Sequence, residues 1–237
     1  MKKTLITLGE PAGIGPDLCV LLSEKYLTKN LIVIADPELI RNSAKTLKKN
    51  IRLNVLENIN SKTISGKFVV NVLPVELTSK NKPGKLNPKN ASYVIKTIKM
   101  AAELCMKKEA TAMVTGPISK SVLNDGGFKI SGHTEFLANI CKSTSVMMLM
   151  NSYMKVALHT THVPLQNVTK HITLESLKRT ITIINNDLKN KFKIRKPKIL
   201  VTGLNPHAGE DGMLGMQDSE VIAPAITDMK KNKILVD

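Results

Sequence analysis

The chain has 237 residues, of which 42% are hydrophobic, and its 35 Lys and Arg against 19 Asp and Glu give a formal net charge of +16 at pH 7. A chain of this length can bury a good core, as one large domain or as two lobes. No apolar run approaches the length of a transmembrane helix, so we expect no membrane span.

The basic charge does not indicate a nucleic-acid partner. Lysines are spread over every segment without an arginine-rich stripe, and aromatic residues make up only 3% of the chain, with no Trp. Few side chains are therefore present on which single-stranded bases would stack. A solvated lysine surface is the favoured interpretation, and such a surface also favours anionic substrates.

The cysteines and the N-terminal stretch indicate a cytoplasmic protein. Cys19, Cys105 and Cys141 are widely spaced, and no CxxC pair suggests zinc or redox chemistry. The stretch MKKTLITLGEPAGIGP lacks the long apolar region and the small-residue cleavage site of a signal peptide. We therefore expect reduced, mostly buried thiols.

Along the chain, strand-like apolar segments alternate with helix-like ones, which is typical of the α/β class. The polar, turn-rich segment 78–90 (TSKNKPGKLNPKN) is the best candidate for a lobe boundary within one domain of residues 1–237. The pattern predicts strands at residues 4–8, 31–35, 51–56, 67–73, 111–115, 146–150, 153–158 and 198–202, and helices at residues 17–26, from 37, at 91–107, from about 133, at 174–190 and from about 219. The strands at 146–150 and 153–158 suit a hairpin over Asn151 and Ser152.

A glycine-rich loop follows the first strand. Residues 9–16 (GEPAGIGP) lead into the helix that starts at Asp17, an arrangement in which backbone N–H groups cradle anions. The spacing is not GxGxxG, and no Lys-Ser/Thr follows, so neither nucleotide-binding fingerprint is present. A tight structural turn and an anion-binding loop are equally compatible with these residues.

Two later loops carry polar side chains. Ser119 and Lys120 follow the strand at 111–115, where they either hold a phosphate or carboxylate or form a solvated helix N-terminus. In GHTE, Thr134 has N-cap character and Glu135 favours a first turn, which predicts a helix start. His133 at that start suits hydrogen bonding to an anionic substrate, although a lone histidine is more often structural.

Histidines also lie in two strand-end loops. The segment 159–165 (HTTHVPL) carries His159 and His162, and the segment 201–212 (VTGLNPHAGEDG) carries His207. Open α/β sheets bind ligands outside the carboxyl ends of their strands. We therefore hypothesise that the two loops meet over one site and that His133 lines the same cleft.

Five motifs resemble those of one family. TLGEPAGIGPD, VTGPISK, GHTEFLA, TTHVPL and GLNPHAGEDGMLG have the order and spacing found in the 4-hydroxythreonine-4-phosphate dehydrogenases of pyridoxal 5′-phosphate biosynthesis. The resemblance runs from Thr4 to about Glu220. It implies a two-lobed α/β/α fold like that of isocitrate and isopropylmalate dehydrogenases, and a homodimer. It also implies NAD- or NADP-dependent oxidation of 4-(phosphooxy)-L-threonine, with decarboxylation to 3-amino-2-oxopropyl phosphate.

The resemblance also implies residue roles. His162 and His207 match two of the family's three ligands to a divalent metal (Zn, Mg or Co), and His133 and Thr134 match substrate contacts. A metal held by neutral imidazoles would act as a Lewis acid on substrate oxygens. His159 is not a family ligand, and Glu10 stands where the family usually has Asp. No residue is assigned as catalytic or as cofactor-binding.

The sequence departs from the family pattern after ILVD at residues 234–237. The resemblance places beyond this point the third metal His, the Lys, Asn and Arg that grip the substrate phosphate, and much of the NAD site. We therefore expect a fragment or a natural truncation that is inactive alone. Three interpretations stay open: the named dehydrogenase, a paralogue acting on threonate or erythronate 4-phosphate, and a non-catalytic remnant.

Overall fold

The computed structural model describes residues 3–25, 27–130 and 132–237, and the chain forms two compact units. Unit 1 comprises residues 1–143 and unit 2 residues 144–237. Within the described residues, no helix is both long enough and apolar enough to cross a membrane.

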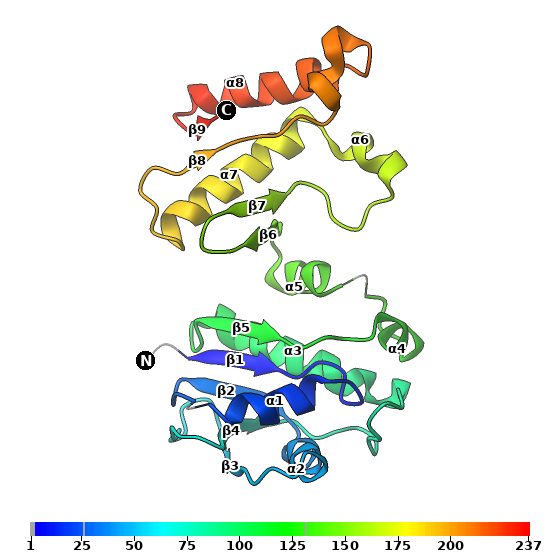
Figure 1. Ribbon diagram of the computed structural model, residues 1–237, viewed down its shortest axis with the longest axis vertical. Coiled ribbons are helices and arrows are strands. Elements are labelled where there is room, and N and C mark those ends of the chain that lie inside the picture. The colour runs from blue at the N-terminus through cyan, green and yellow to red at the C-terminus, as the bar shows by residue number, and fades with distance from the viewer. Residues whose placement is uncertain (1–2, 26, 131) are drawn as a thin grey trace. The chain divides into compact units, whose positions relative to one another are not determined.

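Unit 1 is built on a five-stranded parallel sheet with the strand order β3-β4-β2-β1-β5 (Figure 1). The predicted α/β rhythm is confirmed here, because each predicted strand of this half is present within one or two residues. The strands are β1 (Thr4–Thr7), β2 (Leu31–Ala35), β3 (Arg52–Val55), β4 (Val69–Pro74) and β5 (Ala112–Thr115). The helices are α1 (Gly15–Ser23), α2 (Pro37–Thr46), the short 3₁₀ turn η1 (Pro88–Asn90), α3 (Ala91–Met106), α4 (Lys120–Asp125) and α5 (His133–Cys141).

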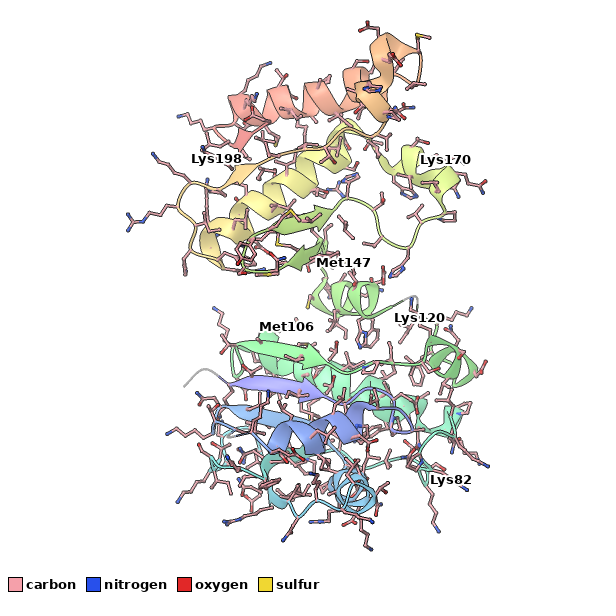
Figure 2. All side chains as sticks on the ribbon, in the orientation of Figure 1. Lys82, Met106, Lys120, Met147, Lys170 and Lys198 are labelled. Carbon is pink, nitrogen blue, oxygen red and sulfur yellow. The ribbon has the colours of Figure 1, made fainter. Side chains whose placement is uncertain are left out.

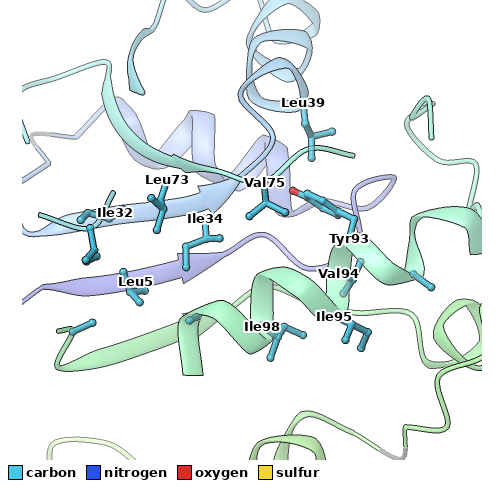
Figure 3. Close-up of a cluster of buried hydrophobic side chains, with 14 of the residues drawn as sticks. Leu5, Ile32, Ile34, Leu39, Leu73, Val75, Tyr93, Val94, Ile95 and Ile98 are labelled. Atoms are coloured by element: carbon cyan, nitrogen blue, oxygen red, sulfur yellow. The ribbon is translucent and has the colours of Figure 1, made fainter. Parts of the chain in front are cut away.

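Helices cover both faces of this sheet, because its central strands are apolar on both sides. In β2, Ile32 and Ile34 pack into a core shared with Val94 and Ile98 of α3 (Figure 3). The alternate residues Val33 and Ala35 belong to a second core with residues of α1 and α2. Successive strand side chains point to opposite faces, so the sequence LIVIA places Ile32 and Ile34 on one face of the sheet and Val33 and Ala35 on the other. Unit 1 is therefore a three-layer α/β/α sandwich.

The polar segment 78–90, expected at a lobe boundary, lies inside unit 1, and the two units divide at Ser143 and Thr144. Backbone and side-chain groups tie the segment to the loop after β1. The Asn81 amide donates to the Pro11 carbonyl (2.9 Å), and the Gly84 N–H donates to the Ala12 carbonyl (2.8 Å). These bonds attach the turn-rich segment to unit 1 although the segment has no apolar core of its own. Its composition alone did not reveal this attachment.

Unit 2 contains two separate two-stranded sheets and a pair of packed helices. Ile181 of α7 packs with Met229 of α8 and with Ile234 and Val236. The strands are β6 (Met147–Met150) antiparallel to β7 (Lys155–Leu158), and β8 (Lys198–Ile199) parallel to β9 (Leu235–Val236). The helical elements are η2 (Leu165–Asn167), α6 (Val168–His171), α7 (Leu174–Asn190), η3 (Pro206–Gly212), the π-helical turn η4 (Asp218–Ile222) and α8 (Ala223–Lys231).

Two predictions in unit 2 are confirmed, and a third is confirmed in part. The hairpin of β6 and β7 and the helix at 174–190 are present as expected. That helix starts with a capping box, in which the Thr173 and Ser176 side chains each bond the other's backbone N–H. The strand predicted at 198–202 is shorter in the structure: β8 covers Lys198–Ile199, and beyond it the Val201 N–H donates to the Asp237 carbonyl (2.6 Å).

Candidate functional site

The carboxyl edge of the unit 1 sheet contains a topological switch point between β1 and β5. These neighbouring strands lead to opposite faces of the sheet, since α1 packs in the core with Val33 whereas Leu123 of α4 packs in the core with Ile34. Crevices at such points are where open α/β sheets bind ligands. The glycine-rich loop 9–16 and the loop 116–119 therefore meet at a position suited to a binding site.

Close backbone packing explains three of the glycines at this edge. A Cβ on Gly15 would lie 1.8 Å from the Leu8 carbonyl oxygen, and one on Gly116 would lie 2.3 Å from the same atom. On Gly9, which has φ +74, a Cβ would lie 2.1 Å from the Pro117 carbonyl oxygen. Of the two interpretations of residues 9–16, the structure thus provides a direct physical reason for the tight structural turn.

Glu10 is a buried carboxyl group at this edge, with 6% of its surface exposed. Its Oε1 accepts a hydrogen bond from the Ala12 N–H (3.1 Å), and its own N–H donates to the Pro117 carbonyl (2.8 Å). Burial raises the pKa of Glu10, and the Ala12 N–H opposes that shift to a smaller extent. The sequence identified Glu10 only as a departure from a family pattern, because the identity of a residue does not show whether its side chain is buried.

The helix predicted at GHTE is confirmed, but its first residues have different roles from those expected. Gly132 is the N-cap and has no side-chain cap bond, while His133 is the first helical residue. Thr134 therefore lies inside the first turn and is not the N-cap. An N-terminus without a side-chain cap leaves its backbone N–H groups available to an incoming acceptor.

Three ionisable side chains gather around this N-terminus of α5. The Glu135 Oε2 and the Lys120 Nζ lie 2.9 and 3.7 Å from the position that a Cβ on Gly132 would occupy; Lys120 is labelled in Figure 2. Within the described residues, His133 Nε2 and Glu135 Oε2 are both buried and without a hydrogen-bond partner. Burial and, to a smaller extent, the Lys120 charge lower the pKa of His133. The site thus combines an uncharged imidazole, an ammonium group and unsatisfied polar atoms.

We expect Lys120→Met to raise the pKa of His133, because the ammonium group disfavours the imidazolium. The pKa should remain below 6.5, its ordinary value, since burial is the larger cause. Because the unfolded chain binds the proton more readily than the folded unit, the stability of unit 1 falls as the pH drops from 6.5 toward the lower pKa of His133 in the folded unit. NMR titration of the His133 ring measures the pKa, and urea denaturation at a series of pH values measures the stability.

The matched control for this titration is Lys129→Met, which removes an exposed lysine of the same unit. It should leave the His133 titration unchanged. An identical His133 pKa in wild type and Lys120→Met would contradict the proximity of the two groups.

The two expected metal ligands, His162 and His207, are both exposed residues of unit 2. His162 follows β7 and has φ 55, and His207 lies in η3 with φ 51. The strands that lead to them, β7 and β8, belong to different sheets. In the described part of the chain, no group of three or more His, Cys, Asp or Glu residues is arranged to hold a metal ion. Joint ligation by the two histidines therefore remains a prediction.

The loop that carries His207 is held by Asp218, which sequence reasoning missed. The buried Asp218 carboxylate accepts from the Leu204 N–H (2.9 Å), the Asn205 N–H (3.1 Å) and the Asn205 side-chain amide (3.2 Å). Residues 207–211 all have positive φ, a conformation that non-glycine residues adopt only when their surroundings enforce it. The only sequence signal for this role was the position of Asp218, an acidic residue directly before the helix predicted from about residue 219.

His159 has both ring nitrogens engaged within unit 2. Its Nδ1 lies 3.1 Å from the Thr180 hydroxyl, and its Nε2 lies 3.1 Å from the Ser176 hydroxyl and 3.2 Å from the His171 carbonyl oxygen. These contacts fix the ring against the first turns of α7. Because both ring nitrogens are engaged, His159 has a structural role here and has no free nitrogen to bind a metal ion.

Comparisons with known proteins agree with this architecture. The family of pyridoxal phosphate biosynthetic protein PdxA matches residues 27–237. The 4-hydroxythreonine-4-phosphate dehydrogenases of Methylococcus capsulatus and Vibrio vulnificus are each 42% identical, over 97% and 98% of this chain and 70% and 71% of their own. The crystal structure of 4-hydroxythreonine-4-phosphate dehydrogenase from Klebsiella pneumoniae is 26% identical with a TM-score of 0.91, and the match covers 100% of this chain and 74% of that one.

Proposed function

We propose, from the premise that this chain belongs to the PdxA family of pyridoxal phosphate biosynthetic proteins, that it serves as a 4-hydroxythreonine-4-phosphate dehydrogenase. The reaction is oxidation of 4-(phosphooxy)-L-threonine by NAD or NADP, with decarboxylation to 3-amino-2-oxopropyl phosphate. An oxidoreductase of pyridoxal phosphate biosynthesis is the function that the names of its relatives support. The two units would correspond to the lobes of an isocitrate-dehydrogenase-like fold.

The observation that best supports this function is the polar cluster at the N-terminus of α5. His133 and Thr134 are proposed to contact substrate there, and Lys120 Nζ, close to Gly132, adds a positive charge suited to a phosphate or carboxylate. The lowered pKa of His133 keeps the imidazole uncharged near neutral pH, so it can donate or accept one hydrogen bond at a substrate hydroxyl. Glu135 limits the net positive charge of the cluster.

His162 and His207 are proposed as ligands to a divalent ion such as Zn, Mg or Co. Such an ion, when bound, supplies a Lewis acid for substrate oxygens. Catalytic zinc sites normally have three protein ligands, and the described residues contain no cluster of three candidate ligands. Two imidazoles therefore do not fit a complete catalytic metal site by themselves, and the proposal assigns them ligation only.

We also propose a homodimer, for which the β6–β7 hairpin is the candidate contact. Tyr153, at the turn of this hairpin, is 95% exposed, and Leu149, Met150 and Met154 are each more than half exposed. Apolar side chains gathered in this way commonly mark an interface. Sedimentation equilibrium of the purified protein distinguishes a dimer from a monomer.

The activity is tested on the native protein, purified from the cells that produce it. NAD and NADP are each supplied as cofactor, and Zn, Mg and Co are each supplied as metal. We expect 4-(phosphooxy)-L-threonine to support nicotinamide reduction and release of carbon dioxide. His133→Ala should lower kcat/KM roughly 3- to 10-fold, as expected for losing one hydrogen bond between neutral groups. Lys129→Met is the control and should retain wild-type kinetics.

Three other results would contradict parts of the proposal. Faster turnover of threonate or erythronate 4-phosphate would assign the protein to a paralogous specificity. Absence of turnover with every substrate and metal would indicate a non-catalytic remnant. Unchanged kinetics of His133→Ala would remove His133 from the substrate site while leaving the activity itself intact.

A further inference from the structure

A cavity of about 270 Å³ lies in unit 2, beside the first turns of α7. It is smaller than the pockets that enclose drug-sized ligands, so it suits a small ion or a small polar group. All of its lining residues belong to residues 144–180, which places the whole cavity within one compact unit.

The lining is polar and has no acidic side chain. Six of its eleven residues carry hydroxyl groups, two are histidines, two are valines, and one is Arg179. Hydroxyl and imidazole N–H groups donate hydrogen bonds, and the guanidinium carries a permanent positive charge with five donors. A pocket with these donors and no carboxylate selects for an anion over a cation.

Arg179 has no counter-ion within the described part of the chain. It forms no ion pair there, although Glu175 lies one turn earlier on the same helix. Arginine is suited to bidentate contacts with phosphate oxygens.

The surrounding side chains are held in place before any ligand arrives. The His159 ring is fixed between the Thr180 and Ser176 hydroxyls, at 3.1 Å from each, and Ser176 Oγ also donates to the His171 carbonyl (2.8 Å). Ser176 is further locked by the capping box at the start of α7. These bonds use the His159, Ser176 and Thr180 donors within the protein, so the groups left to bind a ligand are Arg179 and the hydroxyls of Thr144, Ser145, Thr160 and Thr161.

We propose that this cavity binds a phosphate-class oxyanion, either inorganic phosphate or the phosphate group of a phosphomonoester, with Arg179 as its cationic anchor. The proposal does not depend on dehydrogenase activity or on a metal. It adds an anion site in unit 2 to the polar cluster of unit 1.

The test is calorimetric titration of inorganic phosphate into the protein after treatment with a chelator, with ionic strength held constant by sodium chloride. We expect saturable binding to the wild type and at least a 10-fold loss of affinity in Arg179→Gln. Arg195→Gln, which removes an exposed arginine of the same unit outside the cavity, is the matched control and should bind as the wild type does. Far-UV circular dichroism verifies that each variant is folded.

A second variant and a second ligand sharpen the result. Thr161→Val keeps the shape of a lining residue but removes its hydroxyl, and it should weaken binding a few-fold. Displacement of inorganic phosphate by 4-(phosphooxy)-L-threonine, with the same dependence on Arg179, would identify an ester phosphate as the ligand; failure to displace it would identify free phosphate. The proposal is overturned if binding does not saturate, if Arg179→Gln binds normally, or if binding appears only when zinc is restored.

Discussion

Gly15→Ala should destabilise unit 1 by more than about 3 kcal/mol, a large part of the stability of a typical domain. The added methyl group would lie 1.8 Å from the Leu8 carbonyl oxygen and 2.8 Å from the Leu8 carbonyl carbon. Both are backbone atoms at the end of β1, so no side chain can rotate away. The chain can accept the methyl only by separating α1 from the sheet. Urea denaturation followed by circular dichroism measures the loss.

Gly13→Ala is the matched control, since it adds a methyl group to the same loop. There the new atom would lie 3.3 Å from the Glu10 carbonyl oxygen, a tight contact that a small shift relieves. We expect a change within about 1 kcal/mol. Equal stabilities of the Gly13→Ala and Gly15→Ala variants would mean that the loop is loosely packed and would reopen its interpretation as an anion-binding loop.

Asp218→Ala should both destabilise unit 2 and weaken zinc binding. The variant leaves the N–H groups of Leu204 and Asn205 without their carboxylate acceptor, and losing such bonds costs about 1.5–3 kcal/mol each before relaxation. The left-handed residues 207–211 would then relax, because the Asn205 side-chain amide would keep only its bond to Gln217 Oε1 (3.0 Å). His207 would no longer be presented in one orientation.

Zinc calorimetry on the metal-free protein measures the second effect. We expect weak, reversible binding to the wild type, because two imidazoles make an incomplete ligand set. His207→Ala should abolish that binding, and Asp218→Ala should reduce it at least 10-fold. Asp187→Ala, which removes only an exposed i,i+4 ion pair with Lys191, should change stability by less than about 1 kcal/mol and leave zinc binding intact. Normal zinc binding by His207→Ala would place the metal site elsewhere.

The sequence by itself determined the elements and the family. The strand LIVIA and the helix at 174–190 were predicted with the bounds that the structure has, because apolar periodicity and caps are local properties of the chain. The GHTE helix start and the β6–β7 hairpin followed from the same local signals. The motifs that resemble PdxA proteins needed only residue identity and order, and the comparisons confirmed that family.

Only the tertiary structure decided which distant groups share one environment. The division at Ser143 and Thr144 and the hydrogen bonds that hold the 78–90 segment to the loop after β1 are both features of long-range packing. The placement of Lys120 beside His133 and the hold of Asp218 on the His207 loop likewise join residues that are well separated along the chain. Burial, pKa and hydrogen-bond satisfaction depend on such long-range packing, and a single sequence specifies the side chains without specifying which of them will meet.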